Sequence, residues 1–319
     1  MRLRRSDLGK PGITRRRSGK GFRYLGPDGE PVRELERIKS LVIQPAWEHV
    51  WISPDERGHI QATGVDAAGR KQYLYHPAWR TARDEKKFDH TLRVAERLPE
   101  VRDRLRAHLA GRGLTRSRVL AAIVRLLDLG MFRVGGEQYA AREEDPSFGL
   151  STLRPDHVRT REGRAMVDFP GKSGVRHAVT VDDGEVCQVL RDLRRRRRGE
   201  DRLFAHWDAS ARVWQEVRAE SINEYLREIS GEQMTAKDFR TWHGTVTAAV
   251  ELAEIGPQPT KAKRKKAVAR AMKEVAETLG NTPAVARAAY VDPRVLDEYE
   301  RGHVVANGDE SEVRELLRG

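Results

Sequence analysis

The sequence predicts an α+β protein, with a small β-rich N-terminal domain followed by a mainly α-helical domain that contains a β-hairpin. Short segments with period-two alternation, separated by turns rich in Gly and Asp, lie within residues 21–82. From residue 83 onward, apolar residues instead recur every three or four positions, which is typical of amphipathic helices. With 319 residues, of which 38% are hydrophobic, the chain is long enough to bury two cores.

Residues 1–20 differ from both predicted domains. They contain eight Lys or Arg residues and a single acid, Asp7, with Gly and Ser between them. Such a composition offers little apolar surface to bury. We therefore predict a flexible basic arm over 1–20, a β-rich domain over 21–82 and a helical domain over 83–319.

The N-terminal domain is predicted to contain one short helix, at 35–41, and four strands, at 22–25, 50–52, 58–64 and 70–75. Its last two strands carry polar and aromatic side chains of the kinds that contact phosphates and base edges in DNA. These candidate DNA-binding residues are Gln61, Arg70, Lys71, Gln72 and Tyr73. A solvated antiparallel face would have the same composition, so composition alone leaves both interpretations open.

The second domain is expected to be built on helices. Helical apolar spacing recurs in five segments, at 86–98, 101–110, 117–127, 210–230 and 235–250. Pro99 and Gly113 are expected to break the first three from one another. A β-hairpin is predicted between 165 and 180, with its turn at 170–174.

The charge of the chain indicates an anionic partner. The formal charge of +12 and the pI near 10 favour a polyanion, since neutralising phosphates releases counterions; DNA, RNA or an anionic membrane would each fit. Basic runs at 191–198 and 261–266 are solvated faces or non-specific phosphate contacts.

The single cysteine, Cys187, excludes an internal disulfide and a cysteine-rich zinc site. With no apolar run near 18 residues and no signal peptide, we predict a soluble cytoplasmic protein.

The segment 280–293 presents a single tyrosine, Tyr290, on a short helix of small residues. Gly280 is suited to ending the preceding helix, Thr282 to capping a new one and Pro283 to its first turn. A helix of barely two turns made of Ala, Val and Arg buries little apolar surface. Such a segment is able to present a phenol to a partner, although a lone tyrosine more often packs against a neighbouring helix.

Cationic side chains occur at three places that favour contact with an anion. Arg133 precedes two glycines, which let the backbone approach a bulky group closely. Lys172 lies in the predicted hairpin turn. Lys237 and Arg240 are three positions apart in a predicted helix, so both side chains lie on one face. Taken singly, an arginine before two glycines or a lysine in a hairpin turn is more often a solvated surface residue.

Together these segments resemble the poxvirus-like type IB DNA topoisomerases, over most of residues 20–300. The segment 280–293 is similar to the family's nucleophile segment, 169–172 to the hairpin with its catalytic lysine, and 237–241 to its Lys-Asp-hydrophobic-Arg-Thr helix. Residues 51–62 and 69–77 are similar to its N-terminal domain, which lies on the duplex opposite the catalytic domain. The resemblance implies a catalytic domain of the kind shared by tyrosine recombinases and type IB topoisomerases.

The resemblance also implies a role for each residue. Tyr290 would attack a phosphodiester of double-stranded DNA, Arg133 and Arg240 would hold the non-bridging oxygens, and Lys172 would protonate the departing 5′ oxygen. The 3′-phosphotyrosyl bond conserves the energy of the phosphodiester, so religation needs neither ATP nor metal. The absence of a Walker loop and of an acidic cluster fits this expectation. We therefore expect a monomer that relaxes supercoils without a cofactor.

Asn281 is a departure from the family, which has a histidine nine residues before the nucleophile. An amide can donate a hydrogen bond to a phosphate oxygen, but it cannot carry charge or exchange a proton near neutrality. Both Asn281 and Tyr290 can reach one phosphate only if the chain bends at Thr282 and Pro283. Three alternatives remain open: a tyrosine recombinase, whose arginine helix normally begins with histidine where this chain has Lys237; a non-catalytic nucleic-acid-binding protein; and, disfavoured, an ATP-driven DNA enzyme.

Overall fold

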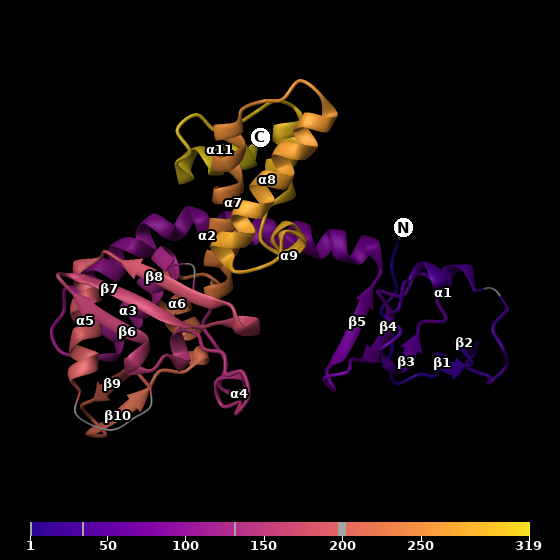
Figure 1. Cartoon of the computed structure of the whole chain (residues 1–319), viewed down its shortest axis with the longest axis horizontal. Coiled ribbons are helices and arrows are strands. Elements are labelled where there is room, and N and C mark those ends of the chain that lie inside the picture. Colours follow the sequence, from indigo (N-terminus) through magenta and orange to yellow (C-terminus); the bar gives the residue numbers. More distant parts are fainter. Residues whose placement is uncertain (1, 34, 131, 197–201) are drawn as a thin grey trace. The chain divides into compact units, whose positions relative to one another are not determined.

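A computed structural model describes residues 2–33, 35–130, 132–196 and 202–319 (Figure 1). The chain forms two compact units, Met1–Asp89 and His90–Gly319. Helix α2, Pro77–Leu109, runs through the division between them, which lies seven residues later than the boundary predicted after residue 82. Among the described residues, no helix combines the length and apolarity that crossing a bilayer requires.

The N-terminal unit is a five-stranded antiparallel sheet with the strand order β2-β1-β3-β4-β5. Its elements are β1 Ile13–Ser18, β2 Gly21–Leu25, α1 Glu36–Ser40, β3 Glu48–Ile52, β4 Ile60–Val65 and β5 Lys71–Tyr75. One sheet face packs its apolar side chains against Ile38 of α1, which is 2% exposed. The β-rich N-terminal domain is thus confirmed.

The prediction of a flexible arm over 1–20 is wrong for residues 13–18, which form β1, paired between β2 and β3 in the sheet. Ile13 is buried in the core, and the Arg15 guanidinium donates to the backbone oxygens of Ile43, Gln44 and Trp47. The period-two pattern of this strand is hard to recognise in the sequence, because most of its side chains are arginines. These arginines hydrogen-bond or face outward, whereas Ile13 packs inward.

Pro99 does not break α2, contrary to expectation. A proline inside a helix leaves the carbonyl four residues earlier without its usual N–H donor. Here that carbonyl belongs to Ala95, and it accepts a hydrogen bond of 3.3 Å from the Arg314 guanidinium of α11. An ion pair between Arg102 and Glu310 also joins α2 to α11. The C-terminal segment therefore supplies the polar contact that Pro99 removes from α2.

The second unit combines helices with two small sheets, and its strand orders are β6-β7-β8 and β10-β9. Its helices after α2 are α3 Arg116–Gly130, α4 Glu137–Ala140, α5 Gly184–Arg195, α6 Ala219–Ser230, α7 Ala236–Ile255, α8 Lys261–Leu279, α9 Pro283–Ala289, α10 Pro293–Glu300 and α11 Glu310–Arg318. Its strands are β6 Val158–Arg161, β7 Arg164–Pro170, β8 Arg176–Val181, β9 Ala205–Asp208 and β10 Val213–Glu216. Short 3-10 turns lie at Leu150–Thr152, Pro155–His157 and Lys172–Gly174. A mainly helical domain with a β-hairpin is thus confirmed.

Two details of this unit differ from the sequence prediction. The helix expected at 210–230 begins only at Ala219, because residues 213–216 pair with β9 and the rings of Trp207 and Trp214 pack edge to face. The arginine run expected at 191–198 belongs to α5 as far as Arg195, and residues 197–201 lie outside the described part of the chain.

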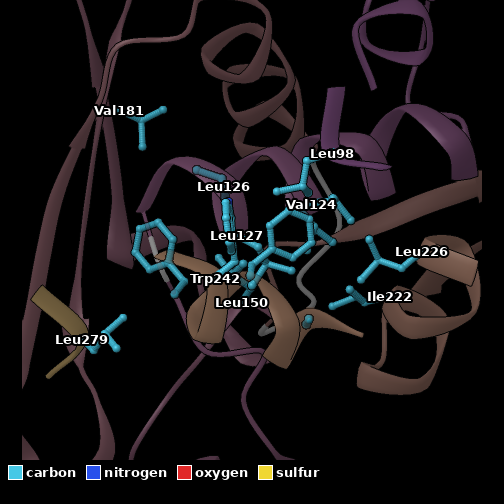
Figure 2. Packing of buried hydrophobic residues seen from close by; sticks show 14 of the residues in the cluster. Leu98, Val124, Leu126, Leu127, Leu150, Val181, Ile222, Leu226, Trp242 and Leu279 are labelled. Atoms are coloured by element: carbon cyan, nitrogen blue, oxygen red, sulfur yellow. The ribbon is translucent and has the colours of Figure 1, made fainter. Parts of the chain in front are cut away.

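One hydrophobic core holds the second unit together. Trp242 of α7, 1% exposed, lies among Leu98 of α2, Leu126 and Leu127 of α3, and other apolar side chains of the cluster (Figure 2). Burying a side chain of this size contributes roughly 1.5–3 kcal/mol or more relative to leaving it exposed. Because α7 and α8 are fixed by this core, the residues at their ends have a rigid support.

Candidate active site

The chain bends sharply between α8 and α9, as predicted from its glycine, threonine and proline. Gly280 adopts a left-handed conformation with φ of +58°, and the N–H of Asn281 donates to the Ala276 oxygen at 2.9 Å. The Thr282 hydroxyl then accepts from the N–H of Val285 and caps α9. This bend brings Asn281 and Tyr290 to the same region although they are nine positions apart in the sequence.

Tyr290 lies directly after α9 and is fixed against α7. A Cβ atom at Gly244 of α7 would lie 2.8 Å from the Tyr290 backbone oxygen and 3.1 Å from its Cβ, so only glycine permits this approach. The Thr245 hydroxyl lies 2.9 Å from the Thr241 oxygen and 3.3 Å from the Tyr290 oxygen, and it accepts from the N–H of Asp292 at 3.1 Å. The backbone of the half-buried tyrosine is therefore held against α7 by Gly244 and Thr245.

Arg133 and Arg240 converge on the C-terminal end of α8. Arg240, which is 4% exposed, donates from Nη2 to the Leu279 oxygen at 2.7 Å. Arg133, which is half-buried, donates from Nη2 to the Gly280 oxygen at 3.1 Å. The last carbonyls of a helix carry partial negative charge, so they are suitable partners for both guanidinium groups.

The paired arginines create a site that favours an anion. Burial, followed by the charge of neighbouring Arg133, lowers the pKa of Arg240 to about 10, so Arg240 remains charged near neutrality. Burial also lowers the pKa of Arg133. The Arg240 guanidinium lies 5.2 Å from the centre of the Tyr290 ring. A phosphate beside Tyr290 would relieve the repulsion between the two cations.

Asn281 contacts Arg133 directly. Its Oδ1 accepts from Arg133 Nη2 at 2.8 Å, and its Nδ2 donates to the Leu279 oxygen at 3.3 Å. An amide nitrogen has two N–H groups, so one remains available for a phosphate oxygen. In this structure the clearest consequence of Asn281 is the orientation of Arg133, which the sequence did not predict.

We expect Asn281→Ala to slow cleavage and religation together, by roughly 10-fold to 100-fold, because Arg133 loses an orienting acceptor and the site loses a donor. Asn281→His should remain active, since an imidazole also offers a polar contact to Arg133 and to a phosphate. Single-turnover cleavage and religation rates test this prediction, with thermal unfolding as the control for folding. A full cleavage rate in a well-folded Asn281→Ala protein would contradict it.

Lys172 is exposed at the tip of the hairpin between β7 and β8. The tip is closed by two backbone hydrogen bonds, from Gly171 N–H to the Val175 oxygen at 2.8 Å and from Gly174 N–H to the Gly171 oxygen at 3.2 Å. The predicted hairpin turn is thus confirmed, and it projects a lysine from two paired strands.

Two adjacent hollows share Arg133 and Arg240 but differ in their other chemical groups. The first, called the lysine hollow, is lined by Lys172, His177, Gly280 and apolar neighbours in addition to the two arginines. The second is lined by Tyr290, Lys237 and Asn223, again with both arginines. The two cations therefore border both the hollow that holds the candidate general acid and the hollow that holds the candidate nucleophile.

The five candidate DNA-binding residues of the N-terminal unit do not share one face. The structure does not support the prediction that Gln61 contacts DNA, because its side chain is only 3% exposed. Its amide donates to the oxygens of residues 55, 56 and 58 and accepts from Arg37. Arg70 and Gln72 both donate to Asp66. Lys71 and Tyr73 alone of the five project from the sheet face opposite the core.

The same sheet face carries further aromatic and basic residues that the sequence did not single out. Cross-strand pairing places Thr14, Trp51, Thr63 and Tyr73 on one face. Period-two alternation adds Arg16 and Tyr75 to this face, which also carries the predicted Lys71, and cross-strand pairing with Arg16 adds Arg23. We call Arg16, Arg23, Trp51, Lys71, Tyr73 and Tyr75 the basic-aromatic face.

Comparisons with known proteins agree over nearly the whole chain. A family model described as the catalytic core of eukaryotic DNA topoisomerase I matches residues 76–314, and a model of the N-terminal domain of bacterial DNA topoisomerase IB matches residues 21–66. DNA topoisomerase 1B of Acanthamoeba polyphaga mimivirus is 30% identical over 299 residues, covering 91% of this chain and 88% of that protein. This chain belongs to the type IB DNA topoisomerase family.

Less similar DNA topoisomerases also match. Vaccinia virus DNA topoisomerase 1B is 23% identical over 288 residues, covering 86% of this chain and 84% of that protein. DNA topoisomerase 1 of Schizosaccharomyces pombe is 28% identical over 171 residues, covering 53% of this chain and 19% of that larger protein. The protein is therefore a DNA topoisomerase, an isomerase whose substrate is DNA.

Sequence reasoning missed three residues around this candidate site: Gly244, Thr245 and His177. The first two lie in α7 immediately after Arg240 and Trp242, where their small and hydroxyl side chains are typical of any buried helix face. His177 lies in a strand, and only the three-dimensional structure brings it to the lysine hollow. The described residues contain no cluster of three or more His, Cys, Asp or Glu side chains able to hold a metal ion.

Proposed function

We propose that this enzyme relaxes supercoiled duplex DNA by cutting one strand through Tyr290, allowing the free end to rotate, and rejoining the strand. The observation that carries the residue assignment is that Arg133 and Arg240 line both the hollow with Lys172 and the hollow with Tyr290. A phosphorus atom bound by the two arginines would have the nucleophile on one side and the acid on the other. An in-line displacement requires that arrangement.

In this proposal the Tyr290 hydroxyl releases its proton to solvent, and its oxygen forms a bond to the phosphorus while the bond to the 5′ oxygen breaks. Arg133 and Arg240 stabilise the charge on the non-bridging oxygens through paired N–H donors, for which a planar guanidinium is well shaped. Lys172 transfers a proton to the 5′ oxygen, which would otherwise leave as an alkoxide. Religation reverses each step, with Lys172 accepting the proton from the 5′ hydroxyl.

Contacts with the duplex outside the scissile phosphate are assigned to two regions. Lys237, exposed at the start of α7 and lining the same hollow as Tyr290, would contact a backbone phosphate near the cut. The basic-aromatic face of the N-terminal unit offers cations for phosphates and rings for base edges or sugars. Of the residues predicted from sequence, Lys71 and Tyr73 retain this role, and Gln61 is assigned to the support of the loop at residues 55–58.

The decisive experiment for the whole reaction is relaxation of a supercoiled plasmid by the purified protein in EDTA, without ATP. We expect relaxation to proceed, because the phosphotyrosyl bond conserves the energy needed for religation. Sedimentation of the protein with a short duplex should give a complex containing one copy of the chain. A strict requirement for ATP would refute the proposed mechanism, and activity only as a tetramer that exchanges strands would favour a recombinase instead.

A further inference from the structure

His177 lies beside the arginine pair, and the reaction described above gives it no task. It is the cross-strand partner of Phe169 in the hairpin sheet and lines the lysine hollow with Lys172, Arg133 and Arg240. Its ring packs edge to face on Phe132 at 4.7 Å and lies 5.3 Å from the ring of Phe169. The aromatic rings fix the plane of the imidazole and shield it from water.

The two nitrogens of this imidazole have different surroundings. The ring makes a hydrogen bond to the backbone of Gly130 that favours its protonated form. Nε2 is buried and has no hydrogen-bond partner within the described residues, so the bond to Gly130 uses Nδ1. Gly130 is the last residue of α3, where helix carbonyls lack intrahelical donors. Nε2 is therefore the nitrogen left for a ligand in the lysine hollow.

Burying a ring nitrogen without a hydrogen-bond partner costs free energy, unless a ligand supplies that partner. Nε2 as a bare lone pair would repel a phosphate oxygen, whereas protonated Nε2 would donate to it. The C-terminal end of α3 supports the protonated ring, since the Gly130 carbonyl accepts from Nδ1 and the helix dipole is negative there. Nε2 therefore lacks a partner in the free protein. Once protonated, it can donate a hydrogen bond to a bound anion.

Burial and the nearby cations together favour the neutral form of the His177 ring before DNA binds. Burial lowers the pKa of His177, and the charges of Arg240 and Arg133 lower it further. Lys172 adds a third cation at the rim of the hollow, whose described lining includes no carboxylate. His157 lies behind Phe169, with ring centres 6.2 Å apart, and does not line the hollow. A bound phosphate would cancel the arginine charges and so remove much of the repulsion that keeps His177 neutral.

We propose that His177 is a further phosphate-binding residue, which takes up a proton from solvent when a DNA phosphate occupies the arginine pair and donates from Nε2 to a non-bridging oxygen. This proposal rests on the proposed phosphate position between Arg133 and Arg240. Asn281 and His177 then contact the phosphate from two sides, and His177 alone changes its protonation. Binding of the phosphate weakens as the pH rises, because the proton is bound only in the complex.

The test measures proton uptake by calorimetry as the Tyr290→Phe protein binds a short duplex, in two buffers with different ionisation enthalpies at a pH of about 7, where histidine titrates. We expect uptake of up to one proton per site in this protein. Adding His177→Gln or His177→Asn should abolish it. Adding His157→Asn should preserve it, because His157 is a partly buried imidazole in the same aromatic cluster but outside the lysine hollow.

The two replacements of His177 separate charge from hydrogen bonding in an otherwise native protein. The amide nitrogen of glutamine occupies a place close to Nε2, so His177→Gln should cleave within a few-fold of the parent rate and lose the dependence on pH between about 6 and 8. Asparagine can replace only Nδ1, so His177→Asn should cleave roughly 10-fold more slowly. Single-turnover cleavage across this pH range provides the measurement.

Three outcomes would overturn the proposal. One is the absence of proton uptake in the Tyr290→Phe protein itself, which requires no change at His177. Another is unchanged uptake in either His177 variant. The third is a well-folded His177→Asn protein with the parent rate and pH profile. A Tyr290→Phe protein that still formed a covalent adduct would refute the assigned nucleophile instead, because proton uptake is measured on binding and does not depend on cleavage.

Discussion

Tyr290→Phe is expected to abolish the covalent protein–DNA adduct and plasmid relaxation while leaving DNA binding and thermal stability close to those of the parent. The change removes one hydroxyl oxygen and keeps the ring, so packing near Arg240, 5.2 Å from the ring centre, is preserved. Gly244 and Thr245 contact only the backbone and Cβ of Tyr290, and these contacts are unaffected. Denaturing electrophoresis of the protein with labelled duplex measures the adduct.

Tyr299 is the matched control, since it lies in the next helix and is the nearest other tyrosine. It is 1% exposed and its hydroxyl donates to the Gly256 oxygen at 2.8 Å, which is a structural contact. Tyr299→Phe should therefore lose about 1 kcal/mol of stability and retain the adduct. An adduct that survives in Tyr290→Phe and disappears in Tyr299→Phe would show that the nucleophile is Tyr299.

Lys172→Ala is expected to slow cleavage by roughly 10²-fold to 10⁴-fold, the range typical of lost general-acid catalysis. Lys172 is exposed at the hairpin tip, so the fold should be unaffected. A duplex whose 5′ leaving group is a much weaker base than an alkoxide should restore most of the lost rate, because such a group departs without a proton. Single-turnover cleavage of both duplexes measures the effect.

Arg164→Ala provides the control for the loss of a positive charge. Arg164 lies at the start of β7, at the opposite end of the strand from the tip, and pairs with Asp182 at the surface. This variant should cleave at nearly the parent rate on both duplexes. If the better leaving group accelerates the parent and Lys172→Ala equally, Lys172 does not act as the acid.

Local signals in the sequence predicted the bend at the site well. Gly280, Thr282 and Pro283 each act on their immediate neighbours, through a left-handed cap, a side-chain cap and a fixed φ, so the structure reproduces them. The predicted hairpin turn around Lys172 follows from similarly local chemistry. Residues of this kind can be placed without knowledge of the rest of the fold.

Predictions failed where a distant segment decides the outcome. Pro99 stays within α2 because Arg314, more than 200 positions away, hydrogen-bonds the carbonyl that the proline leaves free. Gln61 is buried because Arg37 and the loop at 55–58 surround its amide. His177 became part of the site only through the packing of β8 against the end of α3. No pattern within a short window of sequence encodes these contacts.

The attachment of Tyr290 to α7 has a mechanical consequence. With Tyr290 as the nucleophile, the covalent intermediate transmits tension from the rotating DNA strand into the protein through this single residue. The load passes through the Tyr290 carbonyl and the N–H of Asp292, both hydrogen-bonded to the Thr245 hydroxyl. Thr245 lies in α7, three residues after the buried Trp242, so the pull reaches the hydrophobic core directly. The short helix α9 can therefore remain lightly packed without becoming the point at which the enzyme yields.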